Sequence, residues 1–420
     1  MLETFRNAWR VPDIRKSILY TLLILFIYRV GATFIPVAGV NTAAIADMVA
    51  QYDILGFLNM ITGGSFSGFT IFAVGISPYI TASIVMQLLT FAIPSLERMA
   101  KEGGEEGRDK IQRITRYVGV GLAVVMSVGM VFSLRSMMYS FDFLSVTTVV
   151  CTLVAGAMIV MWMAEKITEK GIGNGISLII FIGIVSRIPW SAAEMLGNVF
   201  SGESSFWTLV PVIVISLILV TGVTLIDRAE RRIPIQYAKR VVGRKMYGGQ
   251  STHIPMKLNS AGVLPIIFAM TLLQFPGMIA SFWPTSKFTI WYARILGPNT
   301  ILYAILYALL ILGLSFFYNL ITFNPIDVSK QIQQNGGFIP GIRPGKPTSD
   351  YLMKISSRLT FFGGAFLAIL ATVPSLIAGI FGFQLSMTAT GLLIAVSVAL
   401  ETSKQLESRM LMRHYKGFLK

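Results

Sequence analysis

The chain alternates long apolar stretches with shorter polar ones. A helix that crosses a lipid bilayer needs about 20 predominantly apolar residues. Stretches close to that length occupy residues 18–36, 117–134, 146–164, 206–226, 262–283, 301–323 and 359–381. Three others are shorter or interrupted: residues 76–92 follow a glycine-rich segment, residues 176–188 end at a proline, and the last begins near residue 387. The pattern predicts ten membrane-spanning helices and an all-α polytopic membrane protein.

The charges fix an orientation for these spans. Threading the chain across a membrane ten times places thirty of the 35 Lys and Arg residues on the side of both termini. Short cytoplasmic loops carry such an excess because positive charge resists translocation, so both termini are predicted to be cytoplasmic. With 54% hydrophobic and 13% charged residues, the 420-residue chain has too little polar surface for a soluble globule. The net charge of +15 therefore describes one basic face.

Ten spans divide into two sets of five. Residues 1–190 would hold the first five and residues 191–405 the last five, followed by a cytosolic tail at 406–420. An odd number of spans in each set makes any duplication inverted, with the two halves facing each other across a pseudo-two-fold axis in the membrane plane. No internal sequence repeat supports the symmetry, so this prediction depends on topology.

The second apolar stretch is broken by glycine. Residues 57–70 contain Gly63, Gly64 and Gly68, so this segment cannot span as a helix. Backbone that is not hydrogen-bonded internally is tolerated at membrane depth only where protein buries it or it lines a wet cavity. We expect residues 57–70 to re-enter the membrane from the outside, as in channels and transporters. An interfacial loop covering the helix ends is the alternative.

Two cytosolic loops, residues 227–259 and 324–358, are long for helix connections. Paired basic residues projecting from a hairpin in the first loop could neutralise the phosphates of a ribosome, and anionic lipid headgroups are the alternative partner. These residues include Lys239, Arg240, Arg244 and Lys245. In the second loop, surrounding prolines and glycines would hold Arg343 on a rigid tip.

The sequence offers no chemistry for catalysis. It has two histidines, His253 and His414, and no metal-ligand spacing or nucleophile–base constellation. The glycines near Arg343 are wrongly spaced for a phosphate loop, and Pro347 stands where Ser or Thr should bind magnesium. We therefore expect a conduit with no cofactor. A secondary transporter is disfavoured because all 20 Asp and Glu fall in loops or at span ends.

Two features lie within the spans. Arg29 occupies a mid-helix position, where a charge costs about 2.5 to 3.5 kcal/mol on insertion scales and needs a partner. It could line a substrate pathway, but we favour a clamp that ties the first helix to the end of a neighbour. Ile76 with Ile80, and Ile176 with Ile180, are four residues apart, so each pair shares one helix face. Facing the bundle axis, these side chains would form an apolar constriction to ions; facing lipid, they would be ordinary.

Five stretches carry distinctive motifs. They are TGGSFSG at 62–68, IFAVGISPYITASIVMQLL at 71–89, WMAEKITEKGIGNGISLII at 162–180, QSTHIPMKLNSAGVLPIIFA at 250–269 and FIPGIRPG at 338–345. Together they resemble the bacterial SecY family, the large subunits of protein-conducting translocons, over nearly the whole chain and in the same order. An accessory paralogue devoted to a few substrates would share this architecture.

The resemblance implies an hourglass-shaped channel in the bacterial plasma membrane. The channel would move unfolded, signal-bearing polypeptides across the membrane and release membrane segments sideways into lipid. Implied partners are SecE-like and SecG-like small membrane subunits, the SecA motor ATPase, the ribosome, signal peptides, precursor polypeptides and anionic lipid.

The resemblance also assigns roles to residues. The plug would include Phe57, Leu58, Ile61, Gly63, Gly64, Phe66 and Gly68. The pore ring would consist of Ile76, Ile80, Ile176, Ile180, Ile267 and Ile394. Gln87 and Asn259 would belong to the lateral gate. Arg343 would couple to the motor, and the basic residues Lys239, Arg240, Arg244 and Lys245 would meet the ribosome.

Overall fold

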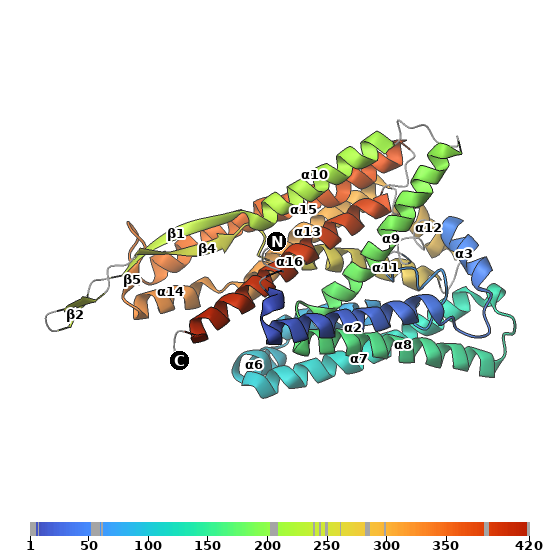
Figure 1. Cartoon of the computed structure of the whole chain (residues 1–420), viewed down its shortest axis with the longest axis horizontal. Helices are drawn as coiled ribbons and strands as arrows, with labels where there is room; N and C mark the ends of the chain where they lie inside the picture. Colours follow the sequence, from blue (N-terminus) through green and yellow to red (C-terminus); the bar gives the residue numbers. More distant parts are fainter. Residues whose placement is uncertain are drawn as a thin grey trace.

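The computed structural model describes residues 6, 8–51, 59, 62–201, 209–237, 240–242, 245–247, 251–260, 262–281, 286–297, 300–381 and 386–417. Each predicted span coincides with a helix in this part of the chain (Figure 1). These helices are α2 (Pro12–Phe34), α5 (Ser77–Ala92), α7 (Gly104–Ser133), α8 (Phe143–Lys170), α9 (Gly175–Phe200), α10 (Leu209–Arg228), α11 (Leu264–Ser281), α13 (Ile301–Thr322), α15 (Lys346–Phe381) and α16 (Ser386–Gly417). The predicted fold class is confirmed.

Helix length and apolar character vary among the spans. Among the described residues, seven helices are long and apolar enough to cross a membrane, and α5 makes an eighth if it is counted with α6 (Pro94–Glu102). The axes of α5 and α6 differ by 104°. The break falls at Ile93, whose extended backbone precedes Pro94. Proline disfavours the helical conformation in the residue before it, which explains where α5 stops.

Several helices run beyond the ranges predicted from hydropathy. We expected the fifth span to end at Pro189, but α9 continues to Phe200. Proline is tolerated inside membrane helices because neighbouring groups can satisfy the freed carbonyl. Similarly, α15 begins at Lys346, well before the apolar stretch, because its first turns are a polar extension outside the span.

The helices form two groups that share a common core (Figure 1). Helices α2, α7 and α8 lie together in one group, and α10, α13, α15 and α16 lie together in the other. Helix α9 contacts α2 and α8 on one side and α16 on the other, whereas α11 contacts α5 and α7 as well as α13 and α15. One large apolar cluster contains residues from both groups. The two groups therefore meet through side chains rather than through lipid.

Short elements mark the two ends of the molecule. The helices α3 (Thr42–Gln51) and α12 (Lys287–Ile295) lie at the end opposite the long hairpin, and the 3-10 turn η1 (Arg135–Met137) contacts α3 (Figure 1). The first turn of α2 and the last turn of α16 lie toward the hairpin end (Figure 1). The two ends of the described chain therefore lie on the side that carries the long polar loops.

The two long polar loops join in one small β-sheet. Strand β1 (Glu230–Tyr237) pairs antiparallel with β4 (Ser251–Lys257), and β2 (Arg240–Val242) pairs with β3 (Lys245–Tyr247) toward the tip. The second loop contributes α14 (Pro325–Gln334) and β5 (Gly337–Phe338), which adds to β1 in the order β4-β1-β5. Ile233 and Ile235 alternate with exposed residues and pack on apolar side chains from α14 and α15. The loops predicted as separate features thus form one unit.

Gly337 lies where the two loops meet. A Cβ at this position would lie 2.9 Å from Tyr237 Cε1 and 3.1 Å from a methyl group of Ile332. We expect Gly337→Val to separate β5 from β1, because overpacking a well-filled site costs about 1–3 kcal/mol. Limited proteolysis of the purified complex should then cleave the hairpin faster. Gln236→Val, at an exposed site on β1, is the control; equal cleavage rates for the two variants would contradict the prediction.

Candidate functional site

The six predicted ring isoleucines all belong to the main apolar cluster or pack against it. Ile80 comes from α5, Ile180 from α9, Ile267 from α11 and Ile394 from α16, and Ile76 caps the start of α5; all five are buried. Ile176 is partly buried and packs against the same cluster. Burial excludes a lipid-facing position for the five. The structure therefore brings isoleucines from both halves of the chain into one buried apolar cluster.

The glycine-broken segment lies against the spans. Phe57, Leu58 and Ile61 are outside the described residues. Residues 62–69 form successive turns, in which Gly63 has a φ of 66° and Gly64 a φ of 94°. The side chain of Phe66 is buried in a second apolar cluster. Glycine adopts these left-handed conformations without steric cost, so the predicted break in the helix has a direct cause.

Helix α2 holds the glycine-broken segment through hydrogen bonds at membrane depth. Arg29 Nη1 donates to the Gly63 carbonyl, and Ser65 Oγ donates to the Ala32 carbonyl at 3.3 Å. Arg29 was expected to bind the end of a neighbouring helix. The clamp is present, but its partner is a turn of the segment. Gly68 lies in the same run of turns and accepts no such contact from α2 among the described residues.

A polar contact joins α5 to α13. Tyr318 Oη of α13 donates a hydrogen bond of 2.6 Å to Gln87 Oε1 of α5. One turn away, the rings of Phe91 and Phe317 meet edge to face with centroids 5.8 Å apart. The amide of Gln87 on α5 thus has its hydrogen-bond partner on a different helix, α13.

Asn259 has a different environment from Gln87. Its Nδ2 donates to the Gly262 carbonyl at 3.1 Å, in the turn that precedes α11. The two predicted gate residues therefore have different hydrogen-bond partners: Gln87 is bonded to Tyr318, and Asn259 to Gly262. Sequence reasoning named Gln87 but missed Tyr318. The signal was available, because an amide within a span needs a hydrogen-bond partner on a facing helix.

Arg343 occupies the tip of the second long polar loop. Gly341 and Gly345 on either side have φ values of 81° and 95°, and the Arg343 side chain is exposed. Thr348 Oγ1 donates to the Arg343 carbonyl at 2.9 Å, and Ser329 Oγ of α14 donates to the Gly345 carbonyl at 2.8 Å. The turn is therefore held from two directions while it presents the guanidinium to solvent.

The basic hairpin residues are described in part. Arg240 is the first residue of β2 and Lys245 the first of β3, so they lie on the two paired strands of the hairpin tip. Lys239 and Arg244 fall outside the described residues. The hairpin extends well away from the helices (Figure 1). This position leaves it accessible to a large partner.

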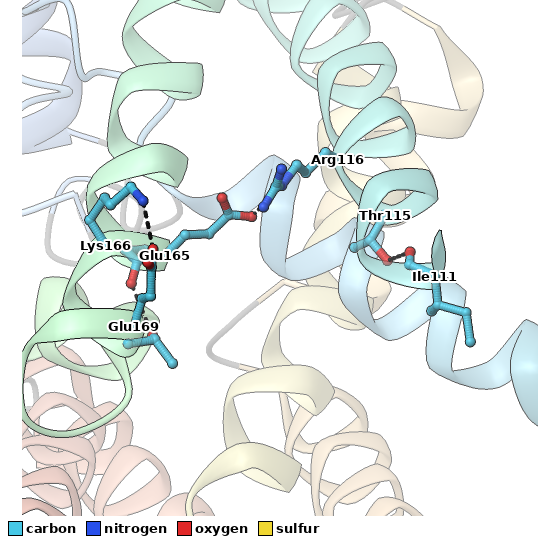
Figure 2. A network of polar contacts seen from close by, with 8 residues as sticks. Ile111, Thr115, Arg116, Glu165, Lys166 and Glu169 are labelled. Atoms are coloured by element: carbon cyan, nitrogen blue, oxygen red, sulfur yellow. Dashed lines mark hydrogen bonds and ion pairs between the residues drawn. The ribbon is translucent and has the colours of Figure 1, made fainter. Parts of the chain in front are cut away.

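An ion pair joins α7 to α8 near the end of α8. Figure 2 shows Arg116 of α7 reaching Glu165 of α8, with Nε and Oε1 2.7 Å apart, beside the Lys166–Glu169 pair. The hydrogen bond from Lys166 lowers the pKa of Glu169 below its usual value. The partly exposed Arg116–Glu165 pair contributes about 0.2–1 kcal/mol. Among the described residues, no group of three or more His, Cys, Asp and Glu could hold a metal ion.

Helix α16 bridges the two groups on the same side. Lys404 Nζ lies 2.6 Å from Asp227 Oδ2 at the end of α10, next to the root of the hairpin. Arg409 Nη1 donates at 2.7 Å to the carbonyl of Gly171, which caps α8. A cation at a helix C-terminus also interacts favourably with the helix dipole. The bridge therefore links the root of the hairpin, through α16, to the end of α8.

Comparisons with known proteins agree on one family. A family model described as SecY matches residues 70–403. The chain is 42% identical over 447 residues to the protein translocase subunit SecY of Streptomyces galbus, with 100% of both chains covered.

Two solved structures share the fold. One, described as showing that the plug domain of the SecY protein stabilises the closed state of the translocation channel and maintains a membrane seal, matches with a TM-score of 0.68 and 21% identity. The other is Sec61 in the canine ribosome–channel complex from the endoplasmic reticulum, with a TM-score of 0.66 and 19% identity. Each match covers 94% of this chain and 92% of the other.

Proposed function

Because the chain belongs to the SecY family, we propose that the isoleucine ring is the pore seal, residues 57–70 are the plug, and the α5–α13 contact closes a lateral gate. The family confirms the resemblance drawn from the motifs. The protein is a multi-pass membrane subunit of a protein-conducting channel and not an enzyme.

The observation that carries the proposal is the isoleucine cluster, which both halves of the chain build together. Dispersion contacts are not directional, so flexible aliphatic side chains can seal around an unfolded chain of any sequence. An apolar constriction also dewets and excludes ions when no chain occupies it. These two properties meet the requirements of a channel that passes polypeptides without leaking ions.

The lateral gate would separate α5 from α11 and α13. Gln87, Tyr318, Phe91 and Phe317 provide its contacts on the described structure. The apolar stretch of a signal sequence gains free energy by moving into lipid, which would draw it between these helices. Asn259, at the start of α11, would act at the same gate when its turn moves with that helix. A partner that binds the open arrangement better would shift the population toward it.

We propose that the halves at residues 1–190 and 191–405 are related by inversion, that the protein lies in the bacterial plasma membrane, and that both termini are cytoplasmic. The concentration of Lys and Arg on one side supports this orientation. Exposed apolar faces on α2 and α10 suit SecE-like and SecG-like membrane subunits as well as lipid. Arg343 suits the SecA motor, and the basic hairpin suits the ribosome that the Sec61 relative binds.

Protease protection of a precursor tests the proposed function. The chain would be reconstituted into liposomes with its co-purifying small subunits, and a signal-bearing precursor would be added with SecA and ATP. We expect ATP-dependent protection of this precursor and none of the same precursor without its signal. No protection, with the small subunits and the motor verified as active, would support the ribosome-dependent or specialised-paralogue alternative.

Tyr318→Phe should make the lateral gate open more easily. The variant loses one neutral hydrogen bond, worth about 0.5–1.5 kcal/mol, so a precursor with a shortened signal should be protected about two- to tenfold faster. Tyr307→Phe is the matched control on the same helix, because the Tyr307 hydroxyl is buried and has no hydrogen-bond partner in the described structure. Equal rates for the two variants would show that the Tyr318–Gln87 contact does not hold the gate.

A further inference from the structure

Arg29 is a cation within a span, and its partner is a main-chain carbonyl. Its guanidinium is partly buried and donates to the carbonyl of Gly63. The Asp and Glu residues lie in loops or at span ends, and the acceptor in this bond is a carbonyl and not a carboxylate. A charge inside a membrane must be paired or hydrated. Arg29 is paired only while the glycine-broken segment lies beside α2, because its acceptor is the Gly63 carbonyl of that segment.

The position of Gly63 is sterically defined. A Cβ on Gly63 would lie 2.7 Å from Gly183 Cα of α9 and 3.1 Å from Arg29 Nη1. Gly63 therefore fits between α2 and α9 only because it has no side chain, and its φ of 66° also favours glycine. This close fit brings the carbonyl to the guanidinium.

Hydrogen bonds inside the segment tie Asn59 to the turns that follow it. Asn59 is buried, and its Oδ1 accepts from the Ser67 backbone N–H at 2.9 Å. The Asn59 carbonyl accepts from the Gly64 N–H at 2.8 Å. A displacement of residues 62–70 as a unit would therefore break the bond to Arg29 and the close packing on Gly183 together.

We infer that Arg29 is a positioning residue that latches the plug in its closed place, an inference that rests on the proposed role of residues 57–70. When the plug leaves, the guanidinium loses its acceptor and must be hydrated in the opened pathway. The latch thus adds to the free energy that a signal sequence must supply before the channel opens. It makes opening selective for strong signals.

Arg29→Met should raise the open probability of the resting channel. Hydrogen bonds to charged groups are worth enough to make the expected increase about tenfold to a hundredfold. The readout is single-channel conductance of the complete complex in a planar bilayer without precursor. Arg29→Lys retains the cation and should restore most of the closure. Arg294→Met removes an exposed cation of α12 and should behave as the parent.

A second readout separates a latch from general structural support. The variant should reduce the ratio between translocation rates of a precursor with a full signal and one with a shortened signal. A merely destabilised complex would lose both rates together. If Arg29→Met does not accumulate, Arg29→Lys is compared with Arg29→Gln, and equal resting conductance in these two would overturn the latch.

Gly63→Ala breaks the same contact from the other side. The added methyl group meets the α9 backbone and displaces the Gly63 carbonyl from Arg29. The double variant with Arg29→Met should open no more than the more open single variant, because both remove one interaction. If the double variant raised the open probability by the product of the two single increases, the latch would be overturned. If Gly63→Ala opens the channel and Arg29→Met does not, Arg29 is not a latch, but residues 57–70 can still be the plug. If neither variant opens the channel, the assignment of residues 57–70 as the plug is wrong.

Discussion

Replacing Arg343 with glutamate is expected to abolish ATP-driven protection of a signal-bearing precursor. The guanidinium is exposed at the end of a turn that is bonded to α14 and to the first turn of α15. A partner that recognises this cation would meet a like charge in the variant, which costs several kcal/mol, so the rate should fall by roughly 100-fold or more. The measurement is the initial rate of protease protection with SecA and ATP.

Lys346→Glu provides the matched control for Arg343→Glu. It makes the same change in charge three residues away, at an exposed site that begins α15. A carboxylate in the first turn of a helix is favourable, so the fold should tolerate it. We expect nearly parental protection in this control. Equal losses in both variants would mean that the motor senses the overall charge of the loop and not the position of Arg343.

The membrane part of the fold follows from the sequence because lipid leaves few alternatives. A span must be apolar over a fixed length, so the positions of α2, α8, α10 and α13 could be predicted from hydropathy. Polar extensions carry no such signal. For this reason the start of α15 at Lys346 was not predicted.

The small β-sheet shows a different limit of sequence reasoning. The alternation of Ile233 and Ile235 with polar residues is visible in the sequence and is typical of a half-buried strand. The pairing of β1 with β5 is not visible, because Gln236 and Phe338 lie in separate loops. Nothing local in either loop specifies that partner. The prediction therefore kept the two long loops apart, whereas the structure joins them through β1 and β5.

Candidate site residues divide in the same way. Helical spacing put Ile76 and Ile80 on one face, but only the resemblance selected Ile267 and Ile394 from the other helices. The chemical need of a polar side chain was also predictable: Arg29 required a partner. Its identity was not, because the acceptor is a backbone carbonyl exposed by the left-handed turn at Gly63.

Changing both Ile80 and Ile180 to glycine is expected to raise the resting ion leak by at least about tenfold. Each change removes a buried aliphatic side chain from the central cluster, so the constriction widens and can wet. The measurement is ion conductance of the reconstituted complex without precursor. Should the leak stay at the parental value, the constriction must lie elsewhere.

The leak must be separated from simple helix destabilisation, since glycine in a helix costs about 1 kcal/mol per site. Ile213→Gly with Ile305→Gly imposes the same backbone cost on α10 and α13, where both side chains are exposed. We expect no added leak from this control pair. The ring and the plug would lie in series along one pathway, so each restricts the current that the other lets through. Adding Gly63→Ala to the Ile80 and Ile180 variant should therefore increase the leak by more than the sum of the two separate increases, whereas independent pathways would give that sum.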